Sequence, residues 1–296
     1  MRSPLDDRIL ASLDGLLRAL DLESVGDDRF LAPPEPDRFT RVFGGQTVAQ
    51  ALLAAGATVD GKAAHSLHAY FVQAGVADHA VEVSVERVRD GRSMTTRRAC
   101  VNQGDRTLLI ALASFHDNPA EPELAHAPPE APAPQDVPRL QEWFDELPPS
   151  LVSQRAAWVD HPPPLDLRIG EAPTFAGGPT ATGSRAHWMR LPRAVGDDPL
   201  LHAVLLAYAT DYLLLDMAFR AYPGDARPHG FAAVSIDHAL WFHRPVRFDR
   251  WHLYTQETIA LAGHRSLVRG SVRDEDGRLV ATVMQEELVR PTVTAS

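Results

Sequence analysis

Apolar residues recur with a helical period in three stretches of this chain. Residues 8–20 form a short amphipathic pattern, and residues 43–59 (FGGQTVAQALLAAGATV) are rich in alanine and leucine behind a pair of glycines. Residues 199–221 are apolar on nearly every side of a helix, which is typical of a helix enclosed by a soluble core. The pattern therefore predicts one peripheral helix and two central helices.

Strand-like alternation of apolar and polar residues follows each central helix. The predicted strands cover residues 65–72, 80–88, 93–101 and 107–115 after the first helix, and 232–242, 251–260, 266–273 and 279–289 after the second, with one more at 185–191 before it. The order of one helix, a long strand and three further strands thus occurs twice along the chain.

The turns of the two halves also correspond. Ser93 aligns with Ser266 and Gly104 with Gly277 when one half is shifted along the sequence by a single constant distance. A long helix followed by an antiparallel sheet that curls around it is the hotdog arrangement. We therefore predict an α+β fold, a double hotdog of two repeats, each with one long helix wrapped by a curved antiparallel sheet.

A proline-rich stretch separates the two halves. Seven of the twenty residues from 119 to 138 are proline and four are acidic, which opposes regular structure. We predict an N-terminal repeat with a leading helix at 1–118, a linker lying over the surface at 119–184, and a C-terminal repeat at 185–296.

Composition excludes several classes of function. The net charge of −10, without a long basic run, opposes binding to nucleic acid. The lone cysteine, Cys100, leaves no intrachain disulfide and no cysteine cluster for a metal, and we expect neither a metal nor a cofactor. The first twenty residues lack the uninterrupted apolar core of a signal peptide, and acidic residues interrupt 199–221, so we expect a cytoplasmic protein without a membrane span.

Candidate chemistry concentrates in the C-terminal half. The chain has no G-x-S-x-G, H-E-x-x-H or P-loop motif, so a nucleophilic triad is not indicated. Asp211 lies within the apolar stretch, where a carboxylate must be hydrogen-bonded or take a proton. Ser235 opens the segment SIDHALWFHRP at 235–245, and Gln285 ends the apolar face of the last predicted strand. Together these groups suit a water held and polarised by a carboxylate.

Other titratable residues nearby are interpreted as structural. Asp211 and Asp216 lie about 140° apart around a regular helix of 3.6 residues per turn, so they are not expected to face one site. Asp237 and His238 are neighbours in a predicted strand and point to opposite faces of the sheet, so we favour a structural role for both.

Several pieces of the chain, in order, resemble the acyl-CoA thioesterase II family from about residue 10 to 291. They are VFGGQTVAQAL (42–52), HSLHAYFVQAG (65–75), RDGRSMTTRR (89–98), LHAVLLAYATDYLLL (201–215), SIDHALWFHRP (235–245) and GSVRDEDGRLVATVMQE (270–286). The resemblance implies a double hotdog that hydrolyses fatty acyl-CoA to free acid and coenzyme A. It also implies a catalytic trio, which falls on Asp211, Ser235 and Gln285 in the C-terminal repeat. One departure is Gln73-Ala74, where family members often carry Arg-Pro.

Candidate substrate-binding residues lie at two further positions. Gly44 and Gly45 begin a predicted helix, where close packing is the usual role and anion binding an alternative. His243 and Arg244 end a predicted strand, where they either touch a phosphate of coenzyme A or lie in solvent.

Two other functions stay open on the same fold. One is a non-catalytic acyl-CoA binding protein, against which the complete trio argues. The other is an enoyl-CoA hydratase, which needs an Asp and His pair, and Asp211 has no histidine within one helical turn in sequence. Since sheets of this type pair edge to edge, we expect a homodimer or homotetramer.

Overall fold

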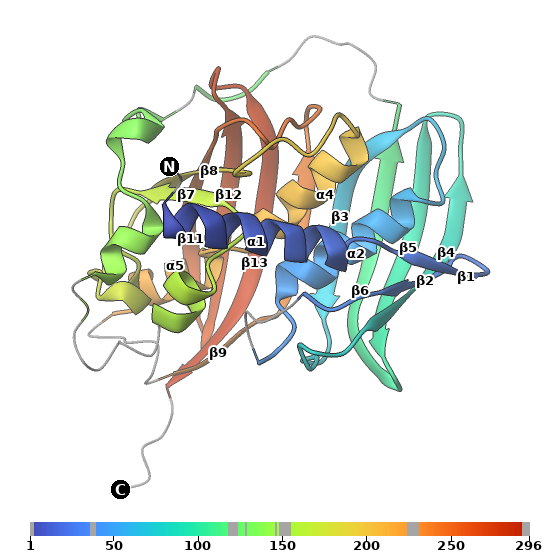
Figure 1. Ribbon diagram of the computed structural model, residues 1–296, viewed down its shortest axis with the longest axis horizontal. Coiled ribbons are helices and arrows are strands. Elements are labelled where there is room, and N and C mark those ends of the chain that lie inside the picture. Colours follow the sequence, from blue (N-terminus) through green and yellow to red (C-terminus); the bar gives the residue numbers. More distant parts are fainter. Residues whose placement is uncertain are drawn as a thin grey trace, which may run out of the picture.

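The computed structural model of the protein describes residues 3–35, 40–117, 124–127, 129–145, 147, 155–223 and 231–291. The described strands form one antiparallel sheet, and the long helices lie along one face of it (Figure 1). Helix α1 lies over this helical layer, and Gln50 of the layer donates a hydrogen bond of 2.9 Å to the carbonyl of Ala19 at the end of α1.

The N-terminal half contains α1 (Pro4–Ala19), which Ser3 and Asp6 cap reciprocally, and the buried helix α2 (Gly44–Gly56). Its strands are β1 (Glu23–Gly26), β2 (Arg29–Ala32), β3 (Ala63–Phe71), β4 (Val81–Asp90), β5 (Met94–Gln103) and β6 (Arg106–His116). The predicted helices and strands of this half are confirmed, whereas the short hairpin β1–β2 has too few residues for its alternation to stand out.

The C-terminal half contains α4 (Pro199–Thr210), α5 (Leu214–Ala221) and the remaining strands. These are β7 (Asp166–Ile169), β8 (Arg185–Arg190), β9 (Phe231–Ser235), β10 (Asp237–Phe242), β11 (His252–Ala262), β12 (Arg265–Asp274) and β13 (Leu279–Pro291). Asp198 caps α4 by accepting from the amide of Leu200, and Pro199 occupies the first helical position, where its missing N–H costs nothing.

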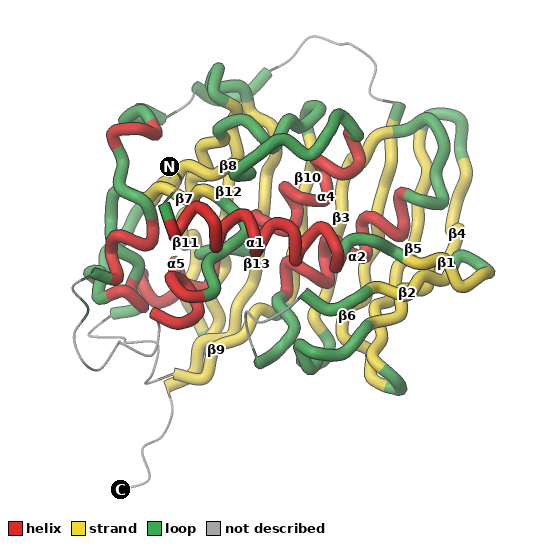
Figure 2. Tube along the Cα trace, in the orientation of Figure 1, coloured by secondary structure: helices red, strands yellow, loops and turns green. Residues whose placement is uncertain are grey.

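The two halves repeat one strand order, mirrored about the middle of the sheet. The order is β1-β2-β4-β5-β6-β3 in the first half and β10-β13-β12-β11-β8-β7 in the second, while β9 pairs with β13. The short strands β1 and β7 lie at opposite ends of the sheet (Figure 2). In the middle, β3 of the first half pairs with β10 of the second half. The sheet edges of the two halves are therefore joined to each other within one chain.

The long apolar stretch is not one helix, contrary to the sequence prediction. Helix α4 ends at Thr210, Asp211 follows as its cap, and Leu213 adopts a left-handed φ of 66° before α5 begins. Such a conformation costs a bulky residue about 1–3 kcal/mol, which surrounding contacts must offset. By length and composition the stretch Pro199–Ala221 could cross a membrane. Of its most apolar 18 residues, however, 78% are buried inside the protein, so the stretch lies in the core as predicted.

The predicted strand 232–242 is also interrupted. Ser235 pairs with Glu287 and Ala239 pairs with Met284, so four steps along this segment match three steps along β13. The extra residue forms a bulge at Ile236, whose N–H donates to the carbonyl of Glu286, while Asp237 accepts a hydrogen bond of 2.7 Å from the amide of Glu286. The bulge reverses the inward and outward alternation between Ser235 and the residues after it.

The segment between the repeats does more than cover the surface, and the prediction of a surface linker is wrong for its second part. Phe144, Leu165 and Ile169 are buried, and β7 extends the sheet by pairing with β8. Apolar residues between the prolines drive this burial. Residues 118–123 and 148–154 lie outside the described residues.

Candidate active site

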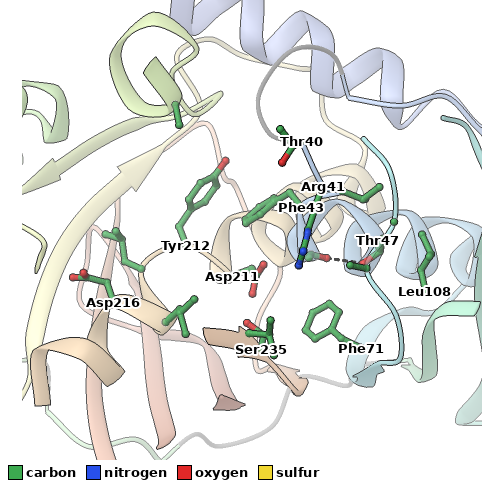
Figure 3. A pocket seen from close by; sticks show the side chains of 18 of the residues that line it. Thr40, Arg41, Phe43, Thr47, Phe71, Leu108, Asp211, Tyr212, Asp216 and Ser235 are labelled. Atoms are coloured by element: carbon green, nitrogen blue, oxygen red, sulfur yellow. Dashed lines mark hydrogen bonds between the residues drawn. The ribbon is translucent and has the colours of Figure 1, made fainter. Parts of the chain in front are cut away.

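A cavity of about 680 Å³ lies between the two halves, and both of them contribute to its wall (Figure 3). The first half supplies residues 40–44 and 71–75, the second supplies 211–213 and Ser235, and the segment between them supplies Trp158 and Phe175. Such a volume is typical of a site for a small organic ligand. Most of its lining is apolar, so the few polar groups stand out.

Asp211 is the acidic group at the centre of this wall. Its Oδ2 accepts a hydrogen bond of 2.8 Å from the backbone N–H of Gly45 in the first turn of α2. The N-terminus of a helix carries partial positive charge and favours an anion. At Gly44-Gly45 the group that meets the helix N-terminus is therefore a side chain of the protein, and binding of a substrate anion by these glycines stays a prediction.

The two glycines allow this approach. A Cβ atom on Gly44 would lie 2.7 Å from Asp211 Oδ2, and one on Gly45 would collide with the carbonyl oxygen of Tyr208. These contacts show the close packing considered for the two glycines.

Burial controls the acidity of Asp211. Removal from water raises the pKa of this carboxyl, while the nearby His238, the amide of Gln285 and the N–H of Gly45 lower it, and the pKa stays above its usual value. The desolvation penalty therefore exceeds the stabilisation from these three groups. A base of raised pKa suits proton abstraction near neutral pH.

The Ser235 hydroxyl lies beside the carboxylate, facing the same part of the cavity (Figure 3). Its Oγ accepts a hydrogen bond of 2.5 Å from Nε2 of Gln285, whose side chain is fully buried. Because the oxygen accepts from Gln285, the hydroxyl hydrogen remains free to donate toward the cavity. The structure thus brings together the three residues that the sequence predicted as a trio.

His238 is a functional candidate that the sequence argument assigned to a structural role. It is 0% exposed, its Nδ1 lies 2.7 Å from Gln285 Oε1, and the same nitrogen lies 4.0 Å from Asp211 Oδ1. The bulge at 236 turns His238 to the same inner face as Ser235, which a regular strand would not do. Asp237 instead accepts a hydrogen bond from the amide of Glu286.

Asp216 corrects a second inference, namely that two acids five residues apart could not share a site. Because the helix breaks at Leu213, both Asp211 and Asp216 line the cavity. Asp216 is nevertheless fully engaged, since its Oδ1 accepts from the backbone and hydroxyl of Thr174 and its Oδ2 lies 2.6 Å from the guanidinium of Arg185. It anchors the segment that carries Phe175.

The remaining candidates, His243 and Arg244, lie away from the cavity. They follow the far end of β10, about 26 Å along the chain from Ser235 at 3.3 Å per strand residue. His243 Nε2 lies 2.9 Å from the hydroxyl of Thr282, and neither residue lines the cavity. Their role in binding coenzyme A stays a prediction. Among the described residues, no three His, Cys, Asp or Glu side chains converge as metal ligands.

Two family models match this chain. One for the acyl-CoA thioesterase N-terminal domain matches residues 32–116, and one for acyl-CoA thioesterase matches residues 159–288. Acyl-CoA thioesterase 2 of Haemophilus influenzae is 30% identical over 94% of this chain and 98% of that protein. Acyl-coenzyme A thioesterase 8 of Mus musculus is 32% identical over 86% of this chain and 83% of that protein.

Solved structures agree with these matches. A tesB protein of Mycobacterium avium subs paratuberculosis has a TM-score of 0.77 at 31% identity, covering 95% of this chain and 100% of that one. The acyl-CoA thioesterase II TesB2 of Mycobacterium marinum has a TM-score of 0.75 at 33% identity, covering 94% and 99%. The fold is that of the hotdog thioesterases, with an antiparallel sheet and helices, and the protein is a thioester hydrolase. The chain belongs to the acyl-CoA thioesterase II family, as its sequence motifs predicted.

Proposed function

We propose that this enzyme hydrolyses fatty acyl-CoA to free fatty acid and coenzyme A, with a water molecule activated by Asp211, Ser235 and Gln285. The observation that carries the proposal is the position of the Asp211 carboxylate. It lies on the wall of a largely apolar cavity, holds the first turn of α2 through Gly45, and has the Ser235 hydroxyl beside it.

The hydrogen bonds define how a water would be oriented. Gln285 donates to Ser235, so Ser235 donates onward to the water oxygen, and the water donates one of its hydrogens to Asp211. The remaining lone pair of the water is then directed at the thioester carbonyl. As the oxygen–carbon bond forms, Asp211 takes the water proton, and the carbonyl π electrons move onto oxygen.

The second half of the reaction returns this proton. The tetrahedral intermediate collapses, the carbon–sulfur bond breaks, and its electron pair leaves on the sulfur of coenzyme A. A thiol has a pKa of about 8.5, so the thiolate is a good leaving group and needs little help before bond cleavage. Asp211 then donates its proton to the thiolate and is a carboxylate again for the next cycle.

The lining of the cavity supports the substrate class. Phe43, Phe71 and Leu108 face the cavity beside the polar wall, and Trp158 and Phe175 face it from the segment between the repeats. An acyl chain would displace water from these surfaces at a gain of about 25 cal/mol per Å². Arg41 is the one basic side chain among the described lining residues, and we assign it to a phosphate of coenzyme A.

Hydration of an enoyl-CoA is the second candidate, because Asp211 and His238 do lie near one another. The two residues are far apart in the sequence, so the sequence analysis did not identify them as a pair. A hydratase, however, needs its histidine at the substrate, whereas His238 is fully buried and does not line the cavity. Loss of the enoyl absorbance of a 2-enoyl-CoA, with no thiol released, would favour this second function.

Release of free thiol from acyl-CoA, followed with a thiol-reactive dye, tests the proposal directly. We expect turnover by the wild-type enzyme across a series from acetyl-CoA to palmitoyl-CoA, with the Asp211→Asn variant as the matched control. Binding of acyl-CoA without any thiol release by the wild type would instead identify a non-catalytic binding protein.

We also propose a double hotdog architecture, because the two halves share one mirrored strand order, and a cytoplasmic location, because of the composition. A homodimer or homotetramer stays our proposal for the assembly. Because β3 and β10 already pair with each other, a second copy would have to meet this chain through other surfaces. Sedimentation of the purified enzyme measures the number of copies.

A further inference from the structure

His238 lies behind the catalytic wall, enclosed between a helix and a strand. Its Nε2 is 3.1 Å from the hydroxyl of Thr210 at the end of α4, and its Nδ1 is 2.7 Å from Oε1 of Gln285 on β13. The ring is 0% exposed and does not line the cavity, so it cannot touch the substrate. Its effect on the reaction must pass through Gln285 or Asp211.

The hydrogen bonds of Gln285 determine which nitrogen of His238 carries hydrogen. A glutamine amide has a donating NH2 end and an accepting oxygen end. The NH2 end faces Ser235, and the same amide lowers the pKa of Asp211, as a donor does. The oxygen end therefore faces His238, and Nδ1 must donate to it.

The opposite orientation of this amide would disturb the site. If the amide turned over, its oxygen would face the carboxylate of Asp211, and two acceptors would repel one another. Ser235 would then have to donate its hydrogen to Gln285 and would have none for the water. In a buried site without competing solvent, a neighbouring donor is what distinguishes the two orientations.

We propose that His238 is a positioning residue, whose Nδ1–H holds the amide of Gln285 with its NH2 group toward Ser235 and Asp211. This inference rests on the proposed role of the trio. The bulge at 236 builds the arrangement, because it places Ser235 and His238 on one face, on either side of the Gln285 side chain. Thr210 holds the other ring nitrogen, which fixes the plane of the imidazole.

Three substitutions at this position separate positioning from simple packing. In His238→Asn an amide nitrogen lies near the place of Nδ1, in His238→Gln it lies near the place of Nε2, and His238→Phe fills the volume without a donor. We expect His238→Phe and His238→Gln to lower kcat about 100-fold with KM within about twofold, because the catalytic groups lose their orientation while the cavity is unchanged. We expect His238→Asn to recover most of that loss, at a melting temperature similar to that of the Gln variant.

A double-mutant cycle with Gln285→Ala tests whether His238 acts on the reaction through Gln285. If His238 acts through Gln285, adding His238→Phe to Gln285→Ala causes little further loss of kcat. Full activity of His238→Phe, or equal losses in the Asn and Gln variants at equal stability, would overturn the inference. Full activity of Gln285→Ala would overturn the proposed function itself, so the two failures are distinguishable.

Discussion

The carboxylate of Asp211 accepts a hydrogen bond from the backbone N–H of Gly45, across 166 residues of sequence. This bond joins the end of α4 in one half to the start of α2 in the other, and the cavity lies where they meet. The active site therefore depends on the contact between the two halves, and neither half holds all of it.

Replacement of Asp211 by Asn should abolish turnover. An amide oxygen can still accept from Gly45, but the amide cannot take a proton from water, so we expect kcat to fall at least about 1,000-fold. Thiol release at pH 7 measures the loss, and a thermal melt checks that the variant is folded.

Activity should decline in acid because of the same group. Asp211 must be ionised to act as a base, and its pKa lies above the ordinary value of 3.8. We therefore expect kcat/KM to fall with decreasing pH through a midpoint above 3.8, in conditions where the fold is intact by circular dichroism. An acid limb below that value would contradict the assignment of Asp211.

Alanine at position 44 should displace the carboxylate. Its Cβ would lie 2.7 Å from Asp211 Oδ2 and 3.0 Å from the ring of Phe71, so the base must shift. We expect a loss of kcat of about 100-fold, as for a catalytic group moved by about 1 Å. Gly170→Ala is the matched control, since a Cβ there meets nothing within 4 Å, and it should leave kcat unchanged.

Removal of the Trp158 ring should extend the range of acyl chains. Trp158 stacks on Phe175 with ring centroids 4.6 Å apart, and both rings line the cavity from the segment between the repeats. We expect Trp158→Ala to shift the optimum toward longer acyl-CoA substrates, because the wall it forms is lost. Trp143→Ala, which removes a ring of the same segment that does not line the cavity, should leave the chain-length profile in place.

Neutralising Glu287 should stabilise the enzyme, and increasingly so at higher pH. Burial and the charges of Asp211, Asp237 and Asp216 raise the pKa of this carboxyl well above 4.5. The folded state then binds more protons than the unfolded state above pH 4.5, so the wild-type free energy of unfolding falls as pH rises. We expect the gain in melting temperature from Glu287→Gln to grow as the pH rises above 4.5.

The neighbouring residue provides the control for this experiment. Glu286 is partly exposed and pairs with Arg265 at 2.9 Å. Glu286→Gln should give no gain that grows with pH. An equal response of the two variants would show that general surface charge, and not the buried Glu287, controls the stability.

Most of the elements could be predicted from the sequence because they depend on local pattern. Period-two alternation located the long strands, and the alanines and leucines after Gly44-Gly45 located α2. The candidate trio could be named because Asp211 and Gln285 are polar residues in otherwise apolar surroundings, and because the motifs around them resemble a known family. These are properties of a short window of residues.

The tertiary structure decided the features that depend on contacts between residues far apart in the sequence. The break after α4 and the left-handed Leu213 lie in a long apolar run that is typical of one continuous helix, and the bulge at Ile236 lies in a run that favours one strand. His238 meets Gln285 across 47 residues, and Asp211 meets Gly45 across 166. Local propensities differ by only about 1 kcal/mol per residue, so a buried carboxylate or a buried amide that needs a distant partner overrides them. The sequence by itself determined the family, most of the elements and the candidate trio, and the packing of the two halves determined how those residues face one another.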